Sequence, residues 1–184
     1  MVIRPREALA MAKNYYAELY FHFVWQTKGR LRLITNDFEQ QIWKMITGKS
    51  TELGAYPIAI GGIEDHVHLL VSTPPTLLLS DFIGKVKGST SHYVNHELKY
   101  PRRFHWGEGY GVLSLAKMNV KGVTAYIRNQ AEHHRRKTTR KIMEHCDQID
   151  PCIVTPVNGG GDHTLGIKPR LKPGASIRLN RTVR

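Results

Sequence analysis

The alternation of apolar and polar residues along the chain predicts four strands and three helices. In the stretch "AELYFHFVWQT", Leu19, Phe21, Phe23 and Trp25 fall on one side, as in a strand with one buried face. Between the predicted strands, apolar residues recur every three or four positions, which is typical of helices with one buried side. The predicted elements are strand 17–27, helix 36–54, strand 56–64, strand 65–72, helix 80–97, strand 109–116 and helix 123–145.

The order β-α-β-β-α-β predicts an α+β, ferredoxin-like antiparallel sheet with an added C-terminal helix. Both connecting helices are expected on one face of the sheet, which leaves the other face open as a platform. Residues 1–146 are expected to form this domain. Residues 147–184 are rich in proline, glycine and basic side chains, so they are expected to form a tail.

The net charge of the chain indicates which class of molecule it binds. Its 27 Lys and Arg residues outnumber its 15 Asp and Glu residues, for a net charge of +12. Such an excess favours a polyanion, because each neutralised phosphate releases condensed counterions. No apolar run is long enough to cross a bilayer, and the first residues lack the apolar core of a signal peptide. We therefore expect a cytoplasmic protein that binds nucleic acid and no membrane.

Two histidines lie two positions apart in "DHVHLLVS". On a strand, His66 and His68 share one face while Val67 points to the other. Two neighbouring neutral imidazoles form half of a metal site. Because the chain has 10 histidines, the pair by itself is better explained as structural or accidental. Asp65 either accepts a hydrogen bond from an imidazole N–H and fixes its tautomer, or is only a turn residue.

A second cluster lies in "TAYIRNQAEHHRRK". Tyr126 and Gln130 are four positions apart, hence one turn apart on the same side of a helix. An amide oxygen combined with two imidazoles and waters suits Mg²⁺ or Mn²⁺. Taken alone, the pair fits a half-buried aromatic residue beside a surface amide. His133 and His134 are interpreted as part of a polar helix face.

Together, "YFHFVWQTK", "EDHVHLLV", "GKVKGSTSHYV", "WGEGYGVLSLA" and "AYIRNQAEHH" resemble the single-tyrosine HUH (IS200-like) transposases of small bacterial and archaeal insertion sequences, over about residues 20–137. The resemblance implies an enzyme that binds a subterminal hairpin in single-stranded DNA, cuts beside it through a 5′-phosphotyrosine, and rejoins strands. It implies that His66, His68 and Gln130 are ligands of Mg²⁺ or Mn²⁺ and that Tyr126 is the nucleophile.

The resemblance also implies a homodimer in which the tyrosine helix of one protomer completes the metal site of the other. Gly122, just before the predicted helix, would supply the flexible joint that this exchange needs. The sequence leaves open whether the site assembles within one chain or between two.

Basic residues near the predicted platform are candidates for contacts with DNA phosphates, which position a nucleic acid without reading its bases. Two alternatives remain: a module that binds single-stranded DNA or RNA without cutting it, and a metal-dependent hydrolase that uses water. The pairing of Tyr126 with Gln130 favours the transposase over both. The basic candidates are Lys28, Arg30, Arg32, Lys85, Lys87, Arg128, Arg135, Arg136 and Lys137.

Overall fold

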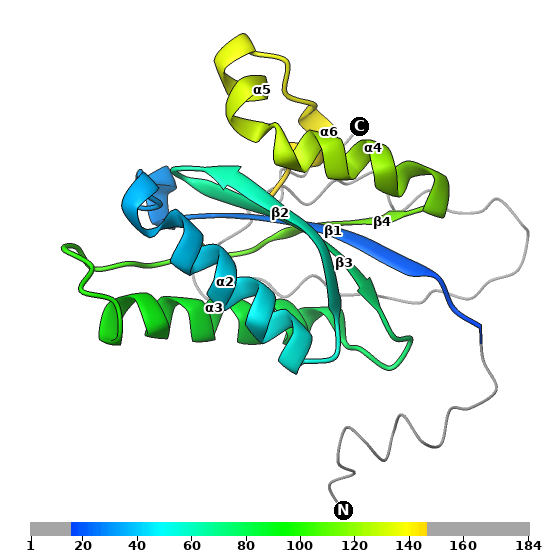
Figure 1. Cartoon of the computed structure of the whole chain (residues 1–184), viewed down its shortest axis with the longest axis horizontal. Helices are drawn as coiled ribbons and strands as arrows, with labels where there is room; N and C mark the ends of the chain where they lie inside the picture. Colours follow the sequence, from blue (N-terminus) through cyan, green and yellow to red (C-terminus); the bar gives the residue numbers. More distant parts are fainter. Residues whose placement is uncertain (1–15, 147–184) are drawn as a thin grey trace, which may run out of the picture. The chain divides into compact units, whose positions relative to one another are not determined.

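The structure, a computed structural model, describes residues 16–146, so the predicted tail at 147–184 lies outside the described residues. Its elements follow the predicted order β-α-β-β-α-β (Figure 1), and three short helices then stand where one was expected. In chain order the elements are β1 (Leu19–Gln26), η1 (Lys28–Arg30), α2 (Asn36–Glu52), β2 (Tyr56–Ile63), β3 (His66–Thr73), α3 (Leu79–His96), β4 (Gly111–Leu115), α4 (Lys117–Arg128), α5 (Gln130–Arg136) and α6 (Lys141–Glu144).

The four strands form one sheet in the order β2-β3-β1-β4, and every neighbouring pair is antiparallel. This is the strand order of the ferredoxin-like fold, so the predicted fold class is confirmed. A turn at Glu64 and Asp65 joins β2 to β3 in the predicted hairpin. The register sets Gly61 of β2 opposite His68 of β3. Within residues 16–146, no helix combines the length and the apolar character that crossing a bilayer requires.

Helices α2 and α3 cover one face of the sheet (Figure 1) and enclose the main apolar core. Phe23 and Trp25 of β1 and Val67 and Leu69 of β3 point into this core and are fully buried. Their spacing of two residues is the alternation that the sequence predicted. The residues between them therefore point to the opposite face, where the histidines lie.

The opposite face of the sheet is covered rather than open, so that expectation was wrong. Helix α4 lies across it (Figure 1), and Val123 and Ile127 pack on Ala59 and Leu70 of the sheet. Met143 of α6 joins the same cluster. Val123 and Ile127 are four residues apart, which gives α4 an apolar side that is buried against the strands.

The continuous helix predicted over 123–145 is also wrong. Helix α4 begins earlier, so Gly122 lies inside it rather than before it. The backbone of Asn129 (φ −106°, ψ 23°) separates α4 from α5, and Lys137 ends α5 in the left-handed region (φ 56°). Thr138 and Thr139 follow, and both are weak helix formers. These breaks turn the chain back, so that α6 lies beside α4.

Candidate active site

His66 and His68 lie side by side on the face of β3 that α4 covers. Their ring centroids are 5.0 Å apart and both side chains are buried. Val67, between them, points into the main core on the other face. The alternation along β3 therefore sets the two imidazoles together, as the sequence predicted.

Each imidazole has a hydrogen-bond partner at Nδ1. The Asp65 carboxylate lies 2.6 Å from Nδ1 of His66, and Nε2 of His22 lies 2.9 Å from Nδ1 of His68. A carboxylate accepts, so His66 carries its proton on Nδ1; the same tautomer of His68 lets its Nδ1–H donate to His22. Both Nε2 atoms are then free to act as ligands, and neither has a hydrogen-bond partner among the described residues.

Burial keeps two of these imidazoles neutral. Desolvation lowers the pKa of His22 to about 3 and lowers that of His68 as well. The pKa of Asp65 is also lowered, for a different reason. Burial by itself would raise it, but the hydrogen bond from His66 and the nearby positive charges, including that of Arg30, together outweigh burial. At neutral pH Asp65 is thus a carboxylate, while His22 and His68 are neutral imidazoles, the form in which a histidine binds a cation.

Tyr126 is buried on the side of α4 that faces the sheet, with its ring edge-on to His68 at a centroid distance of 6.1 Å. Its hydroxyl donates a hydrogen bond to Oε1 of Glu144 and accepts one from the backbone N–H of Arg140 at 3.1 Å. Burial and the hydrogen bond to Glu144 both raise the pKa of Tyr126. The phenol is therefore protonated at neutral pH.

Gln130 is the first residue of α5 and is buried. Its Nε2 lies 3.5 Å from the carbonyl oxygen of Tyr126, at the limit of a hydrogen bond. Its Oε1 has no hydrogen-bond partner among residues 16–146. A buried amide oxygen that accepts no hydrogen bond lowers the stability of the fold unless a ligand binds it. Gln130 is therefore suited to bind a cation.

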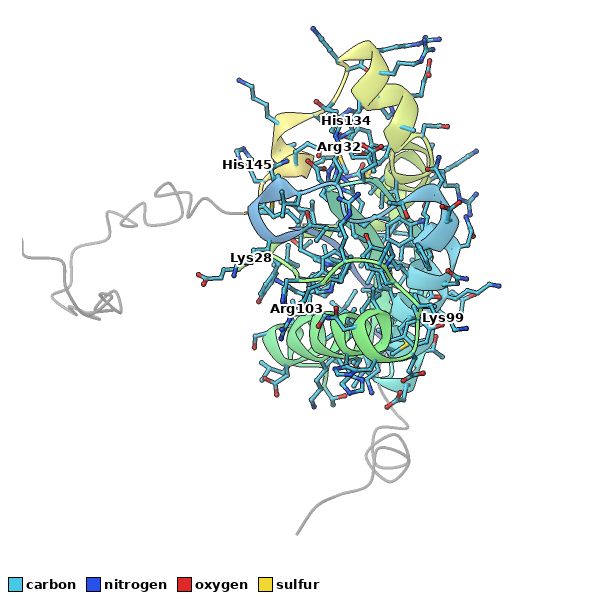
Figure 2. All side chains as sticks on the ribbon, turned by 90° about the vertical axis from the view of Figure 1, so that its left-hand side faces the viewer. Lys28, Arg32, Lys99, Arg103, His134 and His145 are labelled. Carbon is cyan, nitrogen blue, oxygen red and sulfur yellow. The ribbon has the colours of Figure 1, made fainter. Side chains whose placement is uncertain are left out.

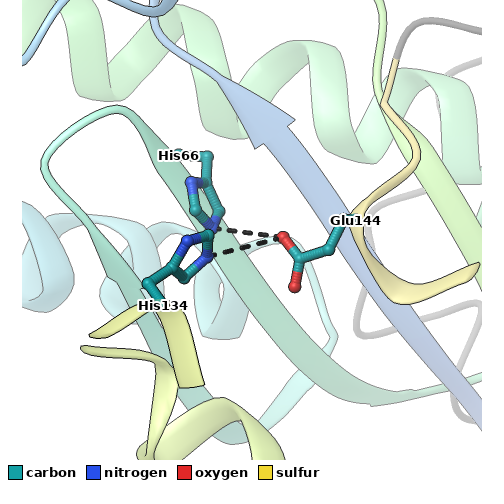
Figure 3. A group of neighbouring side chains, drawn as sticks. All are labelled: His66, His134 and Glu144. Carbon is teal, nitrogen blue, oxygen red and sulfur yellow. Dashed lines mark ion pairs between the residues drawn. The ribbon is translucent and has the colours of Figure 1, made fainter. Parts of the chain in front are cut away.

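Two further side chains lie against the histidine pair, and neither was among the predicted ligands. His134 was expected on a polar helix face. Figure 3 shows His134 of α5 and Glu144 of α6 converging on His66. Oε2 of Glu144 lies 3.4 Å from Nε2 of His66, 3.4 Å from Nε2 of His68 and 3.8 Å from Nε2 of His134. His134 is four residues after Gln130, a spacing that could have indicated a shared side. No motif marks Glu144.

The pKa of Glu144 reflects two opposed effects. Burial by itself would raise it, but the contact with His68 and the hydrogen bond from Tyr126 outweigh burial and bring it to about 2. Burial lowers the pKa of His134. Glu144 is therefore an anion over the physiological pH range, and it faces His68 and His134, whose lowered pKa values favour the neutral form.

Most of the basic candidates are exposed, and several of them pair with carboxylates or carbonyls. Lys87 donates hydrogen bonds to the carbonyls of Gly107 and Gly109 at 2.9 and 2.6 Å, so it holds the loop before β4. Four arginines pair with carboxylates: Arg30 with Asp65, Arg32 with Glu64, and Arg135 and Arg136 with Glu132. Lys28, Lys85, Arg128 and Lys137 are exposed. Figure 2 shows Lys28, Arg32 and Arg103 on the side of the molecule that also carries His134.

Comparison with known proteins adds an independent finding. A family model described as "Transposase IS200 like" matches residues 15–130. The ISDra2 transposase TnpA of Deinococcus radiodurans is 24% identical over 136 residues, which are 70% of this chain and 95% of that protein.

Two solved structures resemble the fold. One, of a Deinococcus radiodurans protein assigned as a transposase, superposes with a TM-score of 0.51 and 25% identity over 65% of this chain and 95% of that chain. The other is a REP-associated tyrosine transposase bound to a REP hairpin. It superposes with a TM-score of 0.51 and 12% identity over 69% of this chain and 74% of that chain, so its likeness concerns the fold alone.

Proposed function

We infer that this chain, which belongs to the IS200-like transposase family, cleaves and rejoins single-stranded DNA at insertion-sequence ends through a covalent bond to Tyr126. One observation carries the proposal. The buried phenol of Tyr126 lies beside the buried imidazole pair in the same chain, although 58 residues separate Tyr126 from His68 in sequence. A domain that only bound nucleic acid would have no need for this juxtaposition.

A divalent cation fits the chemistry of three buried donor atoms. Nε2 of His66, Nε2 of His68 and Oε1 of Gln130 are buried without hydrogen-bond partners in the described part of the chain. We propose these three as ligands of Mg²⁺ or Mn²⁺. When bound, the cation polarises the phosphate and stabilises the charge that develops on the leaving oxygen.

In the proposed reaction the phenol oxygen of Tyr126 attacks phosphorus and forms a P–O bond. The bond from phosphorus to the 3′ oxygen breaks, which leaves a 5′-phosphotyrosine and a 3′-hydroxyl on the other fragment. The 3′ oxygen gains a proton and the phenol loses one. Rejoining is the reverse attack by a 3′-hydroxyl on the phosphotyrosine, and it needs no ATP because the covalent link retains the bond energy.

Tyr126 is inactive in the arrangement described here. Its pKa is raised and the pKa of its acceptor, Glu144, is about 2, so the proton stays on the phenol. Tyr126 is also only 4% exposed. The proposed attack therefore requires α6 to move aside, so that a DNA phosphate reaches the phenol.

Single-stranded DNA with a hairpin is the proposed substrate. The basic side chains on the side of His134 support it, because phosphate contacts from Lys28 and Arg32 would guide a strand towards the site (Figure 2). A homodimer remains a proposal. All the site residues described above come from a single chain, so a partner is not needed to bring Tyr126 to His68.

The test uses the full chain, Mg²⁺ and a hairpin-bearing single strand. Wild type should form a covalent protein–DNA adduct that survives denaturation. Tyr126→Phe should bind the same DNA and form no adduct, and His68→Ala should behave likewise. Tyr110→Phe, a tyrosine packed on Phe23 in the core, is the matched control and should keep the adduct.

Two outcomes would overturn the proposal. An adduct with Tyr126→Phe would assign the nucleophile to another residue. Binding by wild type that is unaffected by EDTA, with no cleavage at any metal concentration, would favour a module that binds nucleic acid without cutting it.

A further inference from the structure

The two carboxylate oxygens of Glu144 contact different groups. Oε1 accepts the hydrogen bond of the Tyr126 hydroxyl, and Oε2 faces the imidazoles. Oε2 lies 3.4 Å from Nε2 of His66 and of His68, and 3.8 Å from Nε2 of His134. The ligand atoms of His66, His134 and Glu144 all lie within 4.8 Å of one another. One oxygen therefore stands among three imidazole nitrogens.

These separations are not those of hydrogen bonds. An imidazole–carboxylate hydrogen bond measures about 2.7–2.9 Å, and none of the three Nε2 atoms has a hydrogen-bond partner among the described residues. Around a four-coordinate cation with bonds of about 2.1 Å, neighbouring ligand atoms lie about 3.4 Å apart. The distances from Oε2 of Glu144 to Nε2 of His66 and of His68 match this spacing, and the distance to Nε2 of His134 is slightly longer.

We propose that Glu144 and His134 are cation ligands in addition to the histidine pair, so that the resting site is closed by α5 and α6 of the same chain. This inference rests on the proposed function only in taking His66 and His68 as ligands. Three imidazoles and a carboxylate are a donor set that suits Mn²⁺ or Zn²⁺ better than Mg²⁺, which prefers oxygen. The chain therefore binds Mn²⁺ more tightly than Mg²⁺ when no DNA is present.

Glu144 then links the cation to the nucleophile. Its Oε2 would bind the cation while its Oε1 holds the hydroxyl of Tyr126, so α6 would be retained over the site as long as both contacts last. A phosphate that replaces Oε2 at the cation would release α6 and the phenol together. The resting site would thus stay closed until DNA arrives.

The test measures binding of Mn²⁺ to the full chain without DNA, from the loss of the electron paramagnetic resonance signal of free Mn²⁺. Glu144→Gln should weaken binding at least about tenfold, and His134→Gln by a similar factor. Glu132→Gln is the matched control, since this carboxylate pairs with Arg135 and Arg136 on α5, and it should bind as wild type does. Added Mn²⁺ should raise the Tm of wild type and of Glu132→Gln more than that of Glu144→Gln.

The inference is wrong if Glu144→Gln binds Mn²⁺ as tightly as Glu132→Gln does. It is also wrong if wild type binds no Mn²⁺, or binds Mg²⁺ as tightly. The proposed function is judged separately by the adduct. If the adduct depends on Tyr126 but Glu144→Gln keeps the wild-type affinity for Mn²⁺, only this inference is refuted. If Mn²⁺ binds through Glu144 but no adduct forms, only the proposed function is refuted.

Discussion

Gly61 controls how closely α4, the helix that carries Tyr126, approaches the sheet. It lies opposite His68, and a Cβ at this position would stand 2.3 Å from the carbonyl oxygen of Ile127 in α4. Ordinary contacts begin at 3.4 Å, so Gly61→Ala has to displace α4 from β2 by about 1 Å. Tyr126 precedes Ile127 directly and should move with it.

The expected cost has two parts. Overpacking at this contact should lower the free energy of unfolding by about 1–3 kcal/mol, measured by urea denaturation. If Tyr126 is the nucleophile as proposed, its displacement by about 1 Å should slow adduct formation about 100-fold under single-turnover conditions. Affinity for the hairpin strand should stay within about twofold, because no proposed DNA contact involves β2.

Gly48→Ala is the matched control. Gly48 lies in α2 with no atom within 4 Å of the added Cβ, so the variant should be unchanged in rate and slightly more stable. Adduct formation by Gly61→Ala at the wild-type rate would refute the reasoning. It would mean that α4 does not rest on the sheet of its own chain when the phenol attacks.

Three further predictions follow from the pKa shifts and hydrogen bonds of the site. The rate of adduct formation should rise with pH from 6 to 9, because the raised pKa of Tyr126 keeps the phenol protonated; a flat pH profile would contradict this. His22 has a pKa of about 3 in the folded protein and about 6.5 in the unfolded chain. Its contribution to the free energy of unfolding is therefore complete above pH 6.5 and is lost as the pH falls below that value. The free energy of unfolding in EDTA should drop by about 2 kcal/mol between pH 7.5 and pH 5 from this group, and His22→Gln should remove that slope. Asp65→Asn should weaken Mn²⁺ binding about 10- to 100-fold, as followed by titration, since the carboxylate orients His66; unchanged affinity would make Asp65 a turn residue only.

Much of the fold could be predicted because apolar residues recur along the chain with the regular spacing of strands and helices. The alternation through Phe23 and Trp25 set the face of β1, and the same rule set His66 and His68 on one face of β3 with Val67 on the other. These residues pack against neighbours whose positions the sheet determines. Tyr126 and Gln130 are both buried, but the break at Asn129 places them in two helices rather than one turn apart on the single helix that was predicted.

The remainder depends on tertiary contacts that periodicity does not encode. The break at Lys137 requires a left-handed backbone at a residue type that usually continues a helix. Glu144 reaches the histidines only because that break reverses the chain, and a helix of four residues has no recognisable period. His22 was not predicted as a site residue because it alternates with core residues along β1. Only the contact with its partner His68, which the sequence does not reveal, shows that it belongs to the site.

The most direct test of the proposed function is to locate the covalent bond. The adduct formed with a hairpin-bearing single strand is digested with a protease, and the peptide that carries DNA is identified by mass spectrometry. We predict a nucleotide on the peptide that contains Tyr126, attached through a 5′ phosphate. Attachment to any other residue, or cleaved DNA with no protein attached at any time, would contradict it.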